Sequence, residues 1–493
     1  MISFAPVIGL EIHAQLLTAS KIFCGCSTRF GAPPNTHVCP VCLGLPGALP
    51  ALNHAAADAA IRAALALNCT IHHVSIFARK NYFYPDLPKG YQISQYERPL
   101  ATDGRIAARS DYWAPEYDIR IKRVHLEEDA GKLLHEGFRD SDAHSYVDLN
   151  RAGTPLIEIV TEPDFRSAND AAAFFSYLRE LLVAIGVNDG NMEEGSLRCD
   201  ANVSVRPDAT ASLGTKTEIK NLNSFRFVEK AIDFEIGRQI EELRAGGRVV
   251  QETRLWDAAG GRTFAMRSKE EAHDYRYFPE PDLPPLLAPA ERIDAIRRAL
   301  PELPAAWRRR LQLDRGLGES DAVALTLKPG LGRYFEDAVD AGAPPKPTAN
   351  FVMGPVRTAL NELGTDDVDV VRAKVPAPAL AALVALIEHG AISHTIGKEV
   401  FGRMLASGRS AREIVEAEGL TQIDDESKIV AVITDVLARN ADAVAQFSGG
   451  KRNAFGFLVG QVMKATGGKA NPRRVNELLR RALGTGHTGG AES

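Results

Sequence analysis

Three stretches in the N-terminal half of the chain alternate between apolar and polar residues. They are residues 10–16, 197–206 and 217–220. In the first, Leu10 and Ile12 share one face, and Glu11 and His13 share the other. A period of two predicts a strand with one packed face and one wet face.

The polar faces of these predicted strands carry mostly short side chains, such as Asp200, Asn202 and Ser204 in the second stretch. A single polar face is most often an ordinary solvated surface. Short Asp, Glu, His, Asn and Ser side chains, however, hold their functional groups near the backbone, which suits a preorganised site. We therefore expect these strands to line a functional site.

Glu158 lies in the otherwise apolar run 156–160, on the face that it shares with Leu156 and Val160. Burying a carboxylate is costly unless it is paired or bound to a metal. Carboxylate oxygens are natural ligands of Mg²⁺. Glu158 is therefore a candidate metal ligand, and an ion pair with a buried Arg or Lys is the alternative.

Three consecutive acids, Glu127, Glu128 and Asp129, precede Gly131 and Lys132. Such a triplet is usually a solvated turn. It gains interest here because a magnesium site needs several carboxylates, and Glu158 supplies only one.

A change in composition divides the chain. Seven prolines between Pro279 and Pro304 indicate a domain edge, and the sequence beyond them is helical. Helices are expected at residues 55–67, 170–185, 225–245, 293–300 and 305–313. The last helix should begin with Asn471 as its N-cap and Pro472 at its first position.

We predict an α+β fold with four parts. A cradle domain on an antiparallel or mixed sheet occupies residues 1–292, and a helical domain follows at 293–395. A small all-α tail domain occupies 396–484, and the Gly-rich end at 485–493 is expected to be disordered.

Four of the six cysteines lie within nineteen positions, as Cys24 and Cys26 followed by Cys39 and Cys42. Two closely spaced pairs are typical of a tetrahedral Cys₄ zinc site, here in the loop 24–42. Four protein ligands leave no open position on the ion, so the expected zinc is structural. Four unrelated cytosolic thiols are the alternative.

The formal net charge of −5 argues mildly against a nucleic-acid binder. From Lys451 to Arg481, however, eight Lys and Arg residues stand against one acid, Glu477, which indicates a local basic patch or a merely solvated basic face. No stretch is long and apolar enough to span a membrane, and the N-terminus lacks a basic leader, so a cytoplasmic protein is expected.

The sequence lacks a phosphate-binding P-loop, a dinucleotide-binding glycine motif and a nucleophile elbow. Patterning alone therefore predicts an acid-lined cradle with a zinc loop, followed by a helical region that ends in basic residues. It does not name a substrate.

Six motifs carry a resemblance to a known family. They are Val7-Ile-Gly-Leu-Glu-Ile-His13, the segment from Arg79 to Gln95, His125-Leu-Glu-Glu-Asp-Ala-Gly-Lys132, the segment from Asp148 to Glu158, Met192-Glu-Glu-Gly-Ser-Leu-Arg-Cys-Asp200, and Asp274-Tyr-Arg-Tyr-Phe-Pro-Glu-Pro-Asp282. Together they resemble the B subunit of the aspartyl/glutamyl-tRNA(Asn/Gln) amidotransferase, the GatB/GatE family, across essentially the whole chain.

The resemblance implies an ATP-dependent carbon–nitrogen ligase with glutamine as nitrogen donor, active as a heterotrimer with the amidase (A) subunit and the small (C) subunit. The side-chain carboxylate of Glu-tRNA(Gln) or Asp-tRNA(Asn) is first phosphorylated with ATP and Mg²⁺. Ammonia from the amidase then displaces phosphate and gives the amide. The resemblance also implies a YqeY-like tail domain that contacts tRNA.

The match to the family implies three sets of site residues. The first set is catalytic and binds Mg²⁺, the second binds nucleotide or substrate, and the third binds tRNA. The first set is Glu11, His13, Glu127 and Glu158. The second is Lys80, Glu128 (also the alternate for Glu127), Lys132, Arg151, Arg198 and Lys220. The third is Lys451, Arg452, Arg473, Arg474, Arg480 and Arg481.

Two functions of other classes stay open. A zinc-dependent hydrolase needs a water position that a Cys₄ site does not offer. A non-catalytic tRNA-binding scaffold would lack ATP hydrolysis dependent on aminoacyl-tRNA.

Overall fold

The computed structural model describes residues 3–108, 117–135, 137, 140–141, 143–207, 212–266, 275–421, 425–451 and 453–484. Arg452 and the end expected to be disordered, 485–493, lie outside the described residues. The chain forms two compact units, Met1–Pro304 and Ala305–Ser493. The division lies later than the boundary expected after residue 292.

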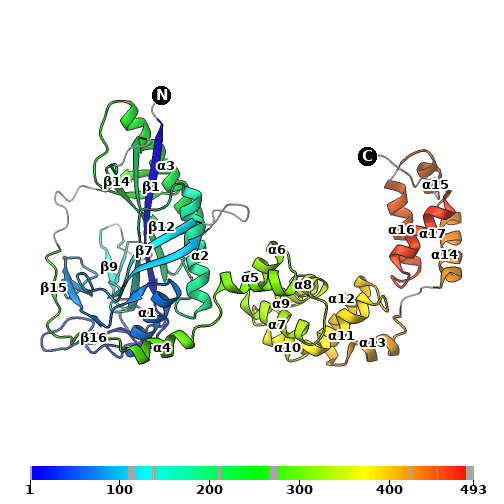
Figure 1. The fold of residues 1–493 in the computed structure, drawn as a ribbon, viewed down its shortest axis with the longest axis horizontal. Helices are drawn as coiled ribbons and strands as arrows, with labels where there is room; N and C mark the ends of the chain where they lie inside the picture. Colours follow the sequence, from blue (N-terminus) through cyan, green and yellow to red (C-terminus); the bar gives the residue numbers. More distant parts are fainter. Residues whose placement is uncertain are drawn as a thin grey trace. The chain divides into compact units, whose positions relative to one another are not determined.

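The first unit is built on a nine-stranded sheet of order β14-β13-β12-β11-β1-β10-β7-β6-β2 (Figure 1). The strands are β1 (Phe4–Gln15), β2 (Thr70–Ile71), β6 (Ala101–Ala108), β7 (Tyr117–Glu128), β10 (Pro155–Thr161), β11 (Leu197–Pro207), β12 (Thr217–Leu222), β13 (Thr253–Asp257) and β14 (Arg262–Ala265). All neighbours are antiparallel except β12 and β13, so the sheet is mixed. The predicted α+β fold is confirmed.

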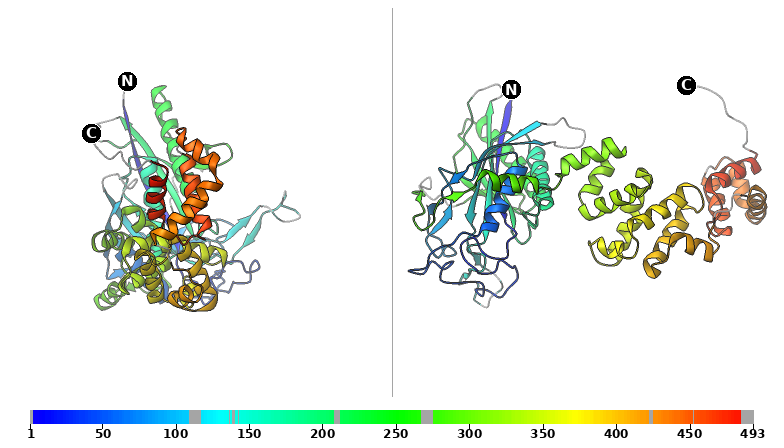
Figure 2. Two further views of the ribbon diagram at one scale, coloured as in Figure 1. Left: turned by 90° about the vertical axis from the view of Figure 1, so that its right-hand side faces the viewer. Right: turned by 60° about the horizontal axis from the view of Figure 1, so that its bottom comes forward.

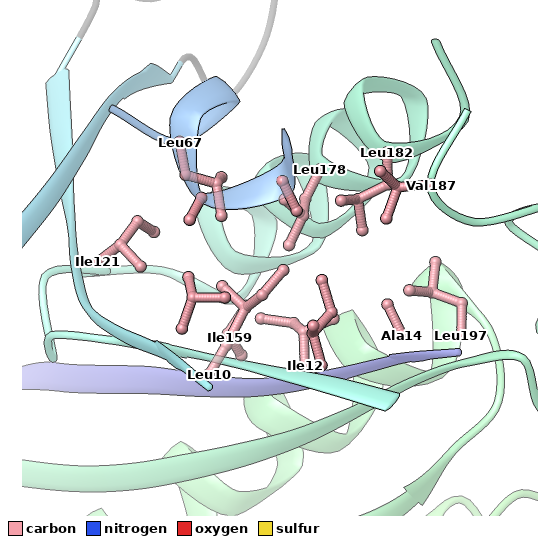
Figure 3. Close-up of a cluster of buried hydrophobic side chains, with 14 of the residues drawn as sticks. Leu10, Ile12, Ala14, Leu67, Ile121, Ile159, Leu178, Leu182, Val187 and Leu197 are labelled. Carbon is pink, nitrogen blue, oxygen red and sulfur yellow. The ribbon is translucent and has the colours of Figure 1, made fainter. Parts of the chain in front are cut away.

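β1, the dark blue strand at the N-terminus in Figures 1 and 2, lies between β10 and β11 in the middle of this sheet. Its alternation separates the two faces as predicted, since Leu10, Ile12 and Ala14 are buried in the core. Figure 3 shows these three side chains pointing toward Leu178 and Leu182 of α2 (Ala168–Ala184).

Three helices cover the apolar face: α1 (His54–Ala66), α2 and α3 (Phe225–Arg244). They were predicted to within two residues because their start signals are local. The side chain of Ser167 caps α2 and that of Ser224 caps α3, each by accepting a backbone N–H. The opposite face of the sheet is lined by polar side chains and carries the candidate site.

Short strands and a helix complete the first unit. They are β3 (Val74–Ser75), β4 (Ala78–Asn81), β5 (Tyr91–Ser94), β8 (Lys132–Leu134), β9 (Tyr146–Asp148), β15 (Phe278–Pro279), β16 (Leu286–Leu287) and α4 (Ala290–Arg298). The order β15-β4-β5 makes a small sheet. Ile293 and Ile296 of α4 pack in the core of this unit, so α4 spans the boundary expected after residue 292.

The second unit is helical and has two separate cores. The first belongs to α5 (Pro304–Arg315), α6 (Glu319–Thr326), α7 (Pro329–Asp340), α8 (Pro345–Phe351), the π-helical turn η1 (Val352–Val356), α9 (Arg357–Glu362), α10 (Asp369–Arg372), α11 (Ala377–Glu388), α12 (His394–Ser407) and α13 (Ala411–Ala417). Ile396, Val400 and Phe401 are part of it. This core therefore continues past residue 395, where we expected the tail domain to begin.

The second core joins α14 (Glu426–Arg439), α15 (Ala441–Ser448), α16 (Asn453–Ala465) and α17 (Pro472–Ala482). The predicted start of α17 is confirmed, because Asn471 Oδ1 accepts from the backbone N–H groups of Arg473 and Arg474. In the part of the chain that the structure describes, every helix is too short or too polar to span a bilayer.

Glu235 of α3 is fully buried against the outer strands of the sheet. Its carboxylate accepts hydrogen bonds from Thr217 Oγ1 at 2.8 Å, from Thr263 Oγ1 at 3.0 Å and from Gln239 Nε2 at 3.0 Å. Arg238 supplies the balancing charge. Burial alone would raise the pKa of Glu235, but the hydrogen bonds from Arg238 and Gln239 outweigh it and lower the pKa.

We predict that Glu235→Ala destabilises the first unit by about 3 kcal/mol at neutral pH, because it leaves Arg238 and three polar side chains without their acceptor. The contribution of Glu235 is present above the ordinary glutamate pKa and is lost as the pH falls through the lowered pKa of the folded state. Thermal unfolding of the full chain between pH 3 and pH 7 measures this. Glu229→Ala, on the exposed side of the same helix, is the control. An equal loss of stability in both variants would contradict the prediction.

Candidate metal and substrate site

Strand register brings three polar side chains side by side on the open face of the sheet. His13 of β1 pairs with Glu158 of β10, and Glu158 pairs with His125 of β7. Directly opposed residues of antiparallel strands hold their Cβ atoms about 5 Å apart. Glu127 lies two residues beyond His125 and so points to the same face.

His13, Glu127 and Glu158 converge, and we call these three residues the acidic centre. His13 Nε2 lies 3.6 Å from Glu158 Oε2 and 3.8 Å from Glu127 Oε1. One ligand atom from each of the three lies within 4.8 Å of the others. An imidazole and two carboxylates at this spacing can hold a divalent cation.

Both carboxylates of the acidic centre are buried, and their charges are balanced by imidazoles. Burial alone would raise the pKa of Glu158, but the charge of His125 and hydrogen bonds from His125 and His13 hold it well below its ordinary value. Burial opposes protonation of His125, yet Glu158 and Glu127 raise its pKa to about 9. Burial also opposes protonation of His13, but Glu158 and Glu127 raise its pKa, so a bound cation would replace the charge of that proton.

Two acids expected to join this group lie apart from it. Glu11 lies two positions before His13 on β1, where its Oε1 accepts from Asn202 Nδ2 at 2.9 Å. Burial and the charge of Glu158 raise the pKa of Glu11. Glu128 points to the other face of β7, where Lys89 and the backbone N–H of Ile93 donate to it.

The acidic triplet is not a solvated turn, because Glu127, Glu128 and Asp129 are only 2%, 3% and 4% exposed. Asp129 interacts with two of the arginine side chains that we predicted to bind nucleotide or substrate. Arg198 Nη2 donates to Asp129 Oδ2 at 2.9 Å, and Arg151 Nε lies 3.6 Å from the same oxygen. Arg198 stands opposite His13 in the register of β1 and β11.

The three lysines predicted to bind nucleotide or substrate have different neighbours. Burial would lower the pKa of Lys80, but the charges of Glu127 and Glu158 raise it, so Lys80 is cationic beside them. Lys220 pairs with Asp200 at 3.1 Å and with Glu218 at 3.0 Å, further along the sheet. Lys132 lies on β8 with its Nζ 4.9 Å from the centre of the Phe30 ring.

Sequence reasoning gave no role to His125 or Arg123, and it noted Asp129 only as a member of the acidic triplet. Arg123 lies on the face of β7 that carries His125, with its Nη2 3.9 Å from Glu158 Oε1. The sequence does carry a signal for His125 and Arg123. It is a further alternating stretch, in which Arg123, His125 and Glu127 alternate with Val124 and Leu126.

The four cysteines of the loop also come together. All four sulfur atoms lie within 4.8 Å of one another, and the Sγ atoms of Cys39 and Cys42 are 3.9 Å apart. A tetrahedral zinc with bonds of about 2.3 Å holds its sulfurs about 3.8 Å apart, so the set fits this ion. A hydrogen bond from the thiol of Cys24 lowers the pKa of Cys42.

A buried lysine anchors the cysteine loop. Lys21 is fully buried, and its Nζ donates to the carbonyl of His37 at 2.7 Å and to that of Leu149 at 3.3 Å. The loop is therefore tied to the segment just before β10, which carries Glu158.

The basic residues of α17 face solvent. Arg473, Arg474, Arg480 and Arg481 are exposed, and so is Lys451, while Val475, Leu478 and Leu479 form the packed stripe. Ala482 is exposed because it lies at the last position of the helix.

Comparison with known proteins assigns the chain to a family. Residues 6–294 match the family described as the GatB/GatE catalytic domain, and residues 333–483 match the GatB domain. The chain belongs to the GatB family. The GatB match begins at residue 333, inside α7 of the second unit.

Several GatB relatives are similar over nearly their full length. The chain is 54% identical to the B subunit of the aspartyl/glutamyl-tRNA(Asn/Gln) amidotransferase of Geobacter sulfurreducens, covering 98% of the chain and 99% of the relative. Proteins of the same name from Thermodesulfovibrio yellowstonii and Myxococcus xanthus are 52% and 51% identical, over 97% and 98% of the chain and 99% of each relative.

We predict that this GatB chain binds one Zn²⁺ through Cys24, Cys26, Cys39 and Cys42. Cys39→Ser and Cys42→Ser should lose the metal and lower the thermal stability of the first unit, because binding free energy at a structural site is folding free energy. Elemental analysis of protein purified under reducing conditions without chelator measures this. Cys69→Ser, in the core outside the loop, should keep the metal. Wild-type protein without zinc would contradict the prediction.

Proposed function

We propose that this chain is the tRNA-handling, ATP-using subunit of a glutamine-dependent tRNA amidotransferase, which acts on Glu-tRNA(Gln), Asp-tRNA(Asn) or both. It works in a heterotrimer with an amidase, which supplies ammonia, and a small third protein. Two things support the proposal: full-length similarity to amidotransferase B subunits, and an acidic centre able to hold the Mg²⁺ of an ATP-dependent reaction.

The reaction has two balanced steps. A side-chain carboxylate oxygen of the aminoacyl-tRNA attacks the γ-phosphorus of ATP, and ADP leaves. Ammonia then attacks the acyl carbon of the resulting acyl phosphate, and phosphate leaves. Neither step needs a nucleophile from the protein, which agrees with the absence of a nucleophile motif.

The chain's own residues orient the reactants and neutralise charge. His13, Glu127 and Glu158 are the residues that would hold Mg²⁺. When bound, the ion lowers the repulsion between ATP phosphates and the substrate carboxylate. Lys80 beside the acidic centre, and Arg198 held by Asp129, offer fixed positive charge to phosphate oxygens.

The convergence of His13, Glu127 and Glu158 carries this proposal. Glu158→Gln in the assembled complex should reduce ATP-dependent amidation at least about 100-fold, because the ion and its opposing charge are lost together. Amide formation on both mischarged tRNAs, with Mg²⁺ varied, measures this. Ammonia production by the amidase and tRNA binding should persist in part.

Glu241→Gln, on the exposed side of α3, is the matched control and should keep full activity. A folded Glu158→Gln complex that amidates at the wild-type rate across the Mg²⁺ series would show that the acidic centre is not the reaction site. A wild-type complex that binds tRNA but hydrolyses no ATP would favour the scaffold instead.

The exposed arginines of α17 support a second element of the proposal, tRNA binding by the tail. Replacing Arg473, Arg474, Arg480 and Arg481 with Ala should weaken tRNA binding and reduce the slope of its salt dependence by about one unit per lost phosphate contact. Amidation at saturating tRNA should survive. Titrations at several salt concentrations measure both quantities.

The paired change of Arg297 and Arg298 to Ala on α4 is the control, because these arginines are also exposed. If the arginines of α17 form only a solvated basic face, the α17 variant will keep the wild-type tRNA affinity and salt dependence. That result would show that the tail does not bind tRNA.

A further inference from the structure

Four tyrosines form a continuous row of rings beside the small sheet β15-β4-β5, and we call it the tyrosine ladder. Tyr82 and Tyr275 meet edge-to-face with ring centres 5.9 Å apart, and so do Tyr275 and Tyr277, also at 5.9 Å. Tyr277 and Tyr96 are stacked at 4.2 Å with nearly parallel planes. Tyr96 is 48% exposed, so the ladder ends at the surface.

The backbone that carries two of these rings is strained and held in place. Arg276, between Tyr275 and Tyr277, has a φ of +44°, a left-handed conformation that is unfavourable for a non-glycine residue. Asn81 fixes this bend, because its backbone N–H donates to the Tyr275 carbonyl at 3.0 Å and its Nδ2 donates to the Arg276 carbonyl at 2.9 Å. Such strain persists only where surrounding contacts enforce it, and it is concentrated at functional positions.

The ladder runs next to the acidic centre. Lys80 Nζ lies 5.0 Å from the centre of the Tyr275 ring. Burial raises the pKa of Tyr277 to about 12, and the charges of Glu127 and Glu158 add to the rise while Lys80 opposes it. The Tyr277 ring is therefore a neutral surface that shares the electrostatic surroundings of the two carboxylates.

Flat neutral rings in a row beside a cation are the chemistry that binds unpaired nucleotides, since every base can stack on an aromatic face. In the proposed function, the reacting amino acid is esterified to the last nucleotide of the tRNA. With its side-chain carboxylate at the acidic centre, the terminal nucleotides must lie close by. The ladder supplies a surface at that position.

We propose that the tyrosine ladder binds the unpaired 3′-terminal bases of aminoacyl-tRNA by stacking. The inference rests on the proposed function and adds the part of the tRNA that is recognised and the residues that recognise it. The base of ATP has the same stacking chemistry. Rings turned edge-to-face, however, present separate faces out to the surface at Tyr96, which suits several splayed-out bases better than the single base of one nucleotide.

The test uses the complete complex and tRNA that carries 2-aminopurine at its 3′ end, whose fluorescence is quenched on stacking. Quenching on binding is expected for the wild type and for Tyr96→Phe, and it should be largely lost in Tyr96→Leu. The kcat/KM for tRNA should fall about tenfold in Tyr96→Leu, with the KM for ATP unchanged. Phe264→Leu on β14, an exposed ring elsewhere in the unit, should behave as wild type.

Three results would overturn the proposal. The first is full quenching in a folded Tyr96→Leu complex with an unchanged kcat/KM for tRNA. The second is a raised KM for ATP with unchanged quenching, which would assign the rings to the base of ATP. The third is a wild-type complex that amidates tRNA without quenching the probe, which leaves the proposed function standing. A wild-type complex that does not bind tRNA at all would instead contradict the proposed function.

Discussion

The burial of two carboxylates at the centre of a sheet constrains much of the first unit. Removing Glu127 and Glu158 from water costs several kcal/mol each, and only fixed opposite charge offsets that cost. His13 and His125 are the nearest partners, and Arg123 and Lys80 surround them. Holding these groups in register requires the neighbouring strands to be rigid. The packing of α1, α2 and α3 against the apolar face provides that rigidity.

Local signals in the sequence predicted the parts of the fold that depend on local physics. The alternation around Leu10 and the cap at Asn471 needed only neighbouring residues, and both are confirmed. The domain edges were harder to predict, because a proline can either break a helix or begin one. Pro304, the last of the seven prolines that indicated a domain edge, is the first residue of α5, where its missing N–H costs nothing.

The candidate site was only partly predictable, because its geometry depends on pairing between distant strands. The sequence marks Glu158 as unusual, but only the register reveals His125 as its neighbour. The same holds for consecutive Glu127 and Glu128, which lie on opposite faces of β7 and therefore have different partners. Membership of the GatB family, in contrast, follows from similarity along nearly the whole chain and needs no knowledge of strand pairing.

The central place of β1 also governs how the protein is made. Glu11 receives a hydrogen bond from Asn202, 191 positions later in the chain, and β1 contacts both β10 and β11. At a synthesis rate of roughly 5–20 residues per second, the ribosome needs on the order of 10–40 s to deliver the partner strand after β1 has emerged. β10, the other partner of β1, emerges earlier, and until it does β1 has no strand to pair with. The nascent chain thus carries an unpaired, aggregation-prone strand until β10 has emerged, and chaperone occupancy of this segment is the expected consequence.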